Sequence, residues 1–129
     1  MILCDTHASV WWLTGDARLT RRAAAALAGG DRAYFSHASL WELAIKVTKF
    51  GAQRVPDLAE AHARLKAHEA PPPFAELAIS RADCIASGEL PLHHGDPFDR
   101  MLAAQALQRK LPILSADKVF DVYGVKRIW

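Results

Sequence analysis

The sequence has 129 residues, of which 51% are hydrophobic and 23% are charged, and its formal net charge is +2. This length suits a single domain spanning residues 1–129, and the composition excludes a disordered chain. No apolar run approaches the ~20 residues that a membrane-spanning helix needs, and so small a net charge neither indicates nor excludes a nucleic-acid partner.

Short apolar segments alternate with helical patterns from the N-terminus to residue 67. Residues 1–4 predict a buried strand, and residues 8–13 predict a short helix with bulky side chains. A second helix, capped by Asp16 or Thr20, contains the alanine run that ends at Gly29. The elements that follow are a strand over residues 33–35 and helices over residues 40–49 and 56–67.

The same alternation continues after a stiff, proline-rich connector at residues 70–73. The expected elements are a strand over 74–79, a helix over 80–88, a loop over 91–95, a helix over 96–107, a strand over 110–115, a helical turn over 119–121 and a strand over 125–129. This order indicates an α/β fold in which helices flank a central, mainly parallel sheet of about five strands.

The N-terminus and the two cysteines bear on where the protein works. Met1 to Asp5 contains no basic segment and reaches an acidic residue at once, so we expect no signal peptide and a cytoplasmic location. Cys4 and Cys84 lack the spacing of metal ligands, and we expect both to be buried thiols in a reducing compartment.

The helix over residues 96–107 begins with acidic residues and turns apolar within one turn. Asp96 suits an N-cap, and Pro97 suits the first helical position, where a missing N–H costs nothing. Asp99 falls in the first turn, where its charge meets the positive end of the helix dipole. Whether Asp96 is a helix cap or a metal ligand stays open at this point.

Four acidic residues follow predicted strands at the same end: Asp5, Glu42, Asp99 and Asp117. In a parallel α/β sheet the strand ends and the following helix starts share one edge, where ligands bind. Two carboxylates about 4 Å apart repel by roughly 4 kcal/mol at an effective dielectric of ~20. Either protons are shared or a divalent cation binds, and all-oxygen ligands favour Mg²⁺ or Mn²⁺. Such a site suits metal-assisted hydrolysis of a phosphodiester.

Four motifs occur in order along the chain: Asp5-Thr6-His7, Ser39-Leu40-Trp41-Glu42, Asp96-Pro97-Phe98-Asp99-Arg100 and Ser115-Ala116-Asp117. Together they resemble the PIN domain family and, more narrowly, the VapC-type toxins of bacterial toxin–antitoxin pairs. The resemblance covers residues 2–129 and implies a PIN fold with Mg²⁺- or Mn²⁺-dependent endoribonuclease activity, restrained by a VapB-type antitoxin. It further implies a homodimer and a larger assembly with the antitoxin.

Carried over by position, the resemblance implies that Asp5, Glu42, Asp99 and Asp117 are the catalytic, metal-binding quartet. It places the hydroxyls of Thr6 and Ser115 beside them. Two alternatives remain in view. One is a PIN-like module that binds RNA or protein without cutting. The other is a phosphatase or phospho-receiver with Asp5 as nucleophile. The phosphatase is disfavoured because His7 stands where a second aspartate is expected, and the receiver because the order of acids and lysine does not match.

Basic and apolar residues around the quartet suggest further contacts. Arg100 and Lys46 are hypothesised to contact RNA phosphates, with solvation at the surface as the alternative.

The adjacent His93 and His94 lack the spacing that puts two imidazoles on one face, so we do not expect them to be metal ligands. The helices over 40–49 and 56–67 predict a hairpin with spare apolar residues, which the resemblance assigns to an antitoxin helix and a second copy.

Overall fold

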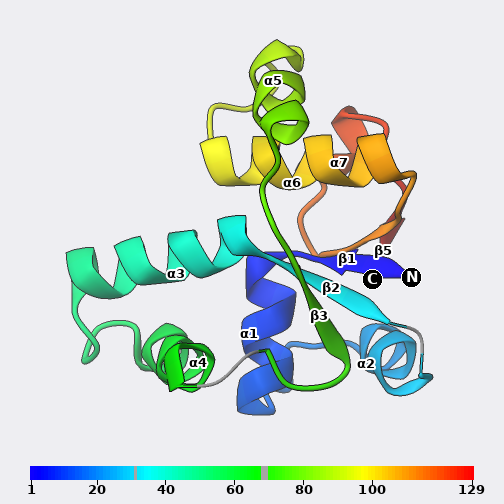
Figure 1. Ribbon diagram of the computed structural model, residues 1–129. Coiled ribbons are helices and arrows are strands. Elements are labelled where there is room, and N and C mark those ends of the chain that lie inside the picture. Colours follow the sequence, from blue (N-terminus) through cyan, green and yellow to red (C-terminus); the bar gives the residue numbers. More distant parts are fainter. Residues whose placement is uncertain (31, 68–69) are drawn as a thin grey trace.

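The computed structural model describes residues 1–30, 32–67 and 70–129, and a five-stranded sheet forms its centre (Figure 1). The strands pair in the order β3-β2-β1-β4-β5, and every pair is parallel. They are β1 (Ile2–Cys4), β2 (Ala33–Ser36), β3 (Phe74–Leu77), β4 (Ile113–Leu114) and β5 (Arg127–Ile128). The predicted α/β fold with a mainly parallel sheet of about five strands is therefore confirmed.

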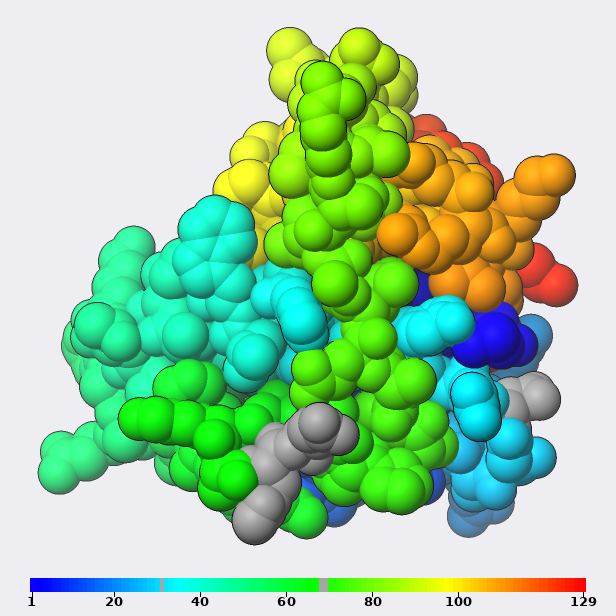
Figure 2. All heavy atoms as spheres, in the orientation of Figure 1, coloured from blue at the N-terminus to red at the C-terminus, as the bar shows by residue number. Residues whose placement is uncertain are grey.

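Helices cover both faces of the sheet. They are α1 (Thr6–Thr14), α2 (Arg21–Ala28), α3 (His37–Phe50), α4 (Pro56–Ala67), α5 (Arg81–Glu89), α6 (Pro97–Arg109) and α7 (Val119–Val122). Figure 1 shows α5, α6 and α7 on one side of the sheet and α1, α2 and α4 on the other, while α3 extends away from the end of β2. In the space-filling view, β3 and α5 form a continuous ridge across the near face (Figure 2).

Side-chain caps decide where several helices begin. Asp5 accepts a hydrogen bond from the N–H of Ala8, so α1 begins at Thr6 rather than at residue 8. Ser36 caps α3 in the same way, and α3 therefore begins at residue 37 rather than at residue 40. Of the two caps expected for α2, Thr20 is used.

The last three strands are shorter than predicted. The predicted strands over 74–79, 110–115 and 125–129 contain four, two and two paired residues, respectively. The central strand β1 has only three residues, so β4 can pair with it only from Leu3 to Cys4. Since β5 pairs only with β4, the two-residue length of β4 limits β5 in turn.

Alternation along β1 divides the core between the two faces. Leu3 belongs to the apolar cluster under α6, together with Ala103 and Ala106, whose small side chains let the helix approach the sheet closely. Ile2 and Cys4 belong to the cluster on the opposite face. Within the described residues, no helix combines the length and apolar character needed to cross a membrane.

The two cysteines differ in exposure. Cys4 is fully buried, as predicted, but Cys84 is exposed, so the prediction of a second buried thiol is wrong. α5 packs against the protein through Asp83 and Ser87, which lie one helical turn apart. The position next to Asp83 therefore faces outward.

Candidate metal centre

The predicted acidic quartet lines one cavity of about 120 Å³ at the carboxyl edge of the sheet. Its walls are formed by Asp5, Thr6, His7, Glu42, Lys46, Asp96, Asp99 and Asp117. β1 ends and α1 begins at this cavity, α6 contributes its N-cap and first turn, and α3 contributes Glu42 and Lys46 from its second and third turns. A larger hollow of about 620 Å³ at the opposite edge is lined by Leu27, Pro73, Phe74 and neighbours, without an acidic side chain among its described residues.

Asp5 is the most buried aspartate of the cavity, at 7% exposure. Its Oδ1 accepts the helix-capping bond from the N–H of Ala8 at 2.7 Å, and its Oδ2 accepts a hydrogen bond from the Ser115 hydroxyl. Burial, reinforced by the charges of Asp99 and Asp117, raises the pKa of Asp5 to about 7. Asp5 is thus a helix cap and a carboxylate whose negative charge is not compensated.

Glu42, in contrast, has a cation beside it. It is buried, and its carboxylate accepts a hydrogen bond from the Thr6 hydroxyl at 2.5 Å. Lys46, one helical turn further along α3, places its Nζ 2.7 Å from Oε2 of Glu42. The hydroxyl of Ser39 lies 3.0 Å from that of Thr6 and extends the network. Lys46 therefore supplies positive charge to one wall of the cavity.

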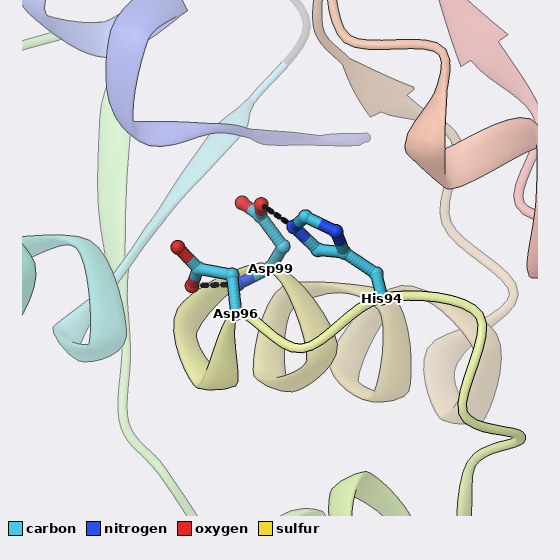
Figure 3. Close-up of side chains that lie close together, drawn as sticks. All are labelled: His94, Asp96 and Asp99. Atoms are coloured by element: carbon cyan, nitrogen blue, oxygen red, sulfur yellow. Dashed lines mark hydrogen bonds and ion pairs between the residues drawn. The ribbon is translucent and has the colours of Figure 1, made fainter.

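Asp96 and Asp99 stand together at the start of α6 (Figure 3). Oδ1 of Asp96 accepts hydrogen bonds from the N–H groups of Phe98 at 2.8 Å and Asp99 at 3.2 Å, so Asp96 is the N-cap. It also lines the cavity, which leaves the cap and ligand roles compatible with each other. Burial, together with the charges of Asp96 and Glu42, raises the pKa of Asp99 to about 6, although a contact from His94 opposes the shift.

His94 is a site residue that sequence reasoning missed. Its Nε2 lies 2.9 Å from Oδ2 of Asp99, and the two side chains point toward each other in Figure 3. The two adjacent histidines differ in their surroundings, and only His94 contacts an acid of the quartet. The ring of His93 packs instead against Tyr123, with 5.5 Å between ring centroids. The available signal was the position of His94 just ahead of the Asp96 cap.

After β4, Asp117 lines the cavity and Ser115 lies behind it, bonded to Asp5. Asp117 is exposed, and its Oδ1 accepts a hydrogen bond from the N–H of Val119 at 2.9 Å. Its own N–H donates to Oγ of Ser115 at 3.0 Å, while the Ser115 hydroxyl donates to Asp5. Ser115 thus links two acids of the quartet, as Thr6 touches a third.

Arg100 lies elsewhere, which does not fit the hypothesis that it contacts RNA. The residue is 8% exposed, and its guanidinium donates at 2.9 Å to the carbonyl oxygens of Ser87, Leu90 and Pro91. These carbonyls lie at and just beyond the end of α5, where a helix leaves its acceptors unpaired. Arg100 therefore anchors that helix end inside the protein.

Two further histidines have contacts that suit packing or surface pairing. His7 lies on the cavity wall, with its ring 5.9 Å from that of Trp11. His37 lies outside the cavity and places its Nε2 2.8 Å from a carboxylate oxygen of Glu76.

The donor set of the cavity fits a hard divalent cation. Five carboxylates line it, with Lys46 as the opposing cation, while His7 lies on the wall and His94 adjoins Asp99. Burial first, and neighbouring carboxylates second, raise the pKa values of Asp5 and Asp99, because no nearby cation offsets these effects fully. Oxygen ligands in a small cavity are what Mg²⁺ and Mn²⁺ prefer, because a cation of this kind relieves the repulsion without soft ligands.

Solved structures support the fold. FitAcB from Neisseria gonorrhoeae is 22% identical, with a TM-score of 0.68 over 98% of this chain and 96% of that one. VapBC2 from Rickettsia felis, solved with a DNA fragment from its promoter, is 16% identical, with a TM-score of 0.69 over 100% of both chains. A toxin–antitoxin complex from Klebsiella pneumoniae is 18% identical, with a TM-score of 0.59 over 92% of this chain and 88% of that one.

Sequence comparison provides the family. Among curated proteins, none matches this chain significantly. The family profile described as the PIN domain, however, matches residues 2–126, which is nearly the whole chain. The match includes all four acids of the predicted quartet and the strands and helices that position them. The chain therefore belongs to the PIN domain family.

Proposed function

We propose that this protein is a Mg²⁺- or Mn²⁺-dependent endoribonuclease and the toxin of a bacterial toxin–antitoxin pair. The observation that carries the proposal is the convergence of Asp5, Glu42, Asp99 and Asp117 on one small cavity. PIN domains are typically nucleases, and the chain belongs to that family. Hydrolysis of an RNA phosphodiester is the chemistry that such an oxygen-lined site supports best. We expect it to act in the cytoplasm, where RNA is available.

In this proposal the quartet holds the metal. A bound Mg²⁺ or Mn²⁺ would polarise a phosphoryl oxygen and lower the pKa of a coordinated water. The chain's own part is to hold the ligands in place. The Thr6 hydroxyl fixes the Glu42 carboxylate, and the Ser115 hydroxyl fixes Asp5 while it accepts a bond from the backbone of Asp117. Such supporting hydrogen bonds orient metal ligands.

Lys46 is the proposed RNA contact. Its ammonium lies on the cavity wall beside Glu42, and its side chain is 31% exposed. A cation at the rim of an acidic site offsets the repulsion between that site and an RNA phosphate. Arg100 is not retained in this role, since its guanidinium is bonded to carbonyl oxygens inside the protein.

The outer face of α3 supports the proposed homodimer and antitoxin contact. Trp41 and Ile45 are 59% and 40% exposed on it, although both are large apolar side chains. They border a hollow of about 460 Å³ together with Ala44, Thr48 and Lys49. Exposed apolar patches of this kind mark protein–protein contacts. Sedimentation of the isolated chain and of its complex with a co-expressed antitoxin would measure both associations.

A cleavage assay on total RNA tests the proposed activity. The parent protein is incubated with Mg²⁺, Mn²⁺ or EDTA, beside Asp99→Asn. Asp121→Asn is the matched control, because Asp121 pairs with Arg127 outside the cavity. We expect cleavage by the parent and the control with either metal, and none with EDTA or with Asp99→Asn. A folded parent that cuts no RNA with either metal would favour the non-cleaving binding module.

A further inference from the structure

We propose that His94, Asp96 and Asp99 form a mixed nitrogen–oxygen metal site that gives the cavity a preference for Mn²⁺ over Mg²⁺. The inference rests on the proposed function, in which Asp99 holds a metal, and it extends the ligand set beyond the acidic quartet. In this site, the imidazole nitrogen of His94 binds the ion directly.

The three side chains are already gathered around one point. One donor atom from each lies within 4.8 Å of the donor atoms of the other two. His94 Nε2 is closest to Asp99, at 2.9 Å from Oδ2. Figure 3 shows the imidazole, from the loop before α6, and both carboxylates, from the start of α6, on the same side of the helix. All three residues are partly exposed, so an ion can reach them from solvent.

Local hydrogen bonds hold Asp96 for this role, and the helix places Asp99 beside it. Oδ1 of Asp96 is fixed by the N–H groups of Phe98 and Asp99, and its second oxygen makes neither of these bonds. Asp99 is anchored in the first turn of the same helix. The His94 side chain, on the preceding loop, and the Asp99 carboxylate, which contacts it, therefore adjust around the fixed Asp96 carboxylate when an ion enters.

The ligand types decide which ion is preferred. Carboxylate oxygens bind Mg²⁺ and Mn²⁺ alike, but an imidazole nitrogen favours transition metals over Mg²⁺. Replacing the imidazole by a carboxamide should therefore weaken Mn²⁺ binding much more than Mg²⁺ binding. His93 provides a matched control, since it is the neighbouring histidine and its ring packs against Tyr123.

The first experiment measures metal affinity without RNA. Isothermal titration gives the Mn²⁺ and Mg²⁺ dissociation constants of the full-length parent, His94→Gln and His93→Gln. We expect His94→Gln to weaken Mn²⁺ binding about 10-fold or more while changing Mg²⁺ binding less than about 3-fold. His93→Gln should match the parent for both ions. Equal losses of both ions in His94→Gln would mean that His94 only positions Asp99, and the inference would be overturned.

A spectroscopic measurement separates a ligand from a neighbour. Pulsed electron paramagnetic resonance of the Mn²⁺-loaded protein should show coupling to a directly bound imidazole nitrogen in the parent and in His93→Gln. The coupling should be absent from His94→Gln. A parent that lacks it would overturn the inference even if RNA cleavage with Mg²⁺ upholds the nuclease proposal. Conversely, nitrogen coupling in a protein that cuts no RNA would uphold this site and refute the nuclease.

Discussion

The fold shifts the pKa values of two buried aspartates, Asp5 and Asp83, in opposite directions. Asp83 is fully buried between α5 and α6, where the guanidinium of Arg109 donates to both its oxygens, at 2.7 and 3.1 Å. Burial acts to raise its pKa, but the hydrogen bonds from Arg109, the N–H of Ser80 and Gln105 outweigh burial and lower the pKa to about 2. Asp5 has only a hydroxyl and a backbone N–H, and its pKa rises to about 7.

The difference distinguishes Asp83, an acid that stabilises the fold, from Asp5, an acid of the candidate metal centre. Asp83 meets its charge partner within the protein, and Gln105 connects it further to the Ser36 hydroxyl, which lies 2.6 Å from Gln105 Oε1. The network therefore ties α5 and α6 to the cap of α3. The charge of Asp5 has no cation partner in its hydrogen bonds and lies beside two other acids. A buried carboxylate left in this condition indicates a place for a bound cation.

The largest expected effect comes from removing the site acid. Asp5→Asn should reduce RNA cleavage about 100-fold or more, because a proposed ligand to the metal is lost. The free energy of unfolding of the metal-free protein should stay level or rise, since the amide keeps the cap while removing the repulsion. Cleavage rates and denaturant unfolding in EDTA measure the two effects. Cleavage at the parental rate would show that Asp5 is not needed to bind the metal.

Breaking the ion pair between Asp83 and Arg109 should lower stability rather than RNA cleavage. Arg109→Met leaves the Asp83 carboxylate buried without its cation, which should cost about 3 kcal/mol in the free energy of unfolding. Arg81→Met is the control, because Arg81 is exposed on the same helix as Asp83. Denaturant unfolding at neutral pH checks this expectation. A loss no larger than that of Arg81→Met would show that the pair adds little to stability.

The two acids should also give opposite responses to pH. The folded-state pKa of Asp5 is raised to about 7, so the folded protein holds a proton that the unfolded chain has lost above about pH 4. The stabilisation from this group is therefore lost as pH rises from about 4 to about 7, and the loss is about 2 to 4 kcal/mol. The lowered pKa of Asp83 has the reverse sign, since its contribution is present above about pH 4 and is lost as pH falls toward about 2.

Unfolding of the parent and Asp5→Asn in EDTA, at pH 4.5 and pH 7.5, tests this contrast. The parent should lose stability between the two values, and the variant should lose markedly less. Parallel behaviour of the two proteins would mean that Asp5 ionises in the folded protein much as it does in the unfolded chain.

The smallest expected effect concerns Lys46, which gives Glu42 the partner that Asp5 lacks. Lys46→Met should tighten Mn²⁺ binding about 3-fold, because it removes a positive charge close to the proposed ion. The same change should weaken RNA binding. Titration calorimetry and an RNA-binding assay can follow both, with Lys49→Met as the control on the same helix. An unchanged Mn²⁺ affinity would show that Lys46 does not oppose the ion.

The sequence determined the order of the elements, the α/β class and the arrival of four acids at one edge of the sheet. These features follow from local signals. Apolar runs and caps mark the ends of strands and helices, and parallel pairing brings those ends together. The family resemblance added the chemistry to that arrangement, and the family itself is confirmed by the match over residues 2–126.

Only the tertiary structure decided which charged side chains find a partner and which do not. Arg100 faces the end of α5, Arg109 meets Asp83 26 residues away, and His94 rather than His93 turns to Asp99. Cys84 faces solvent because Asp83, next to it, faces the interior. Each of these outcomes depends on the direction of a side chain relative to another element. A local pattern does not contain that direction, because it arises only when the helices pack.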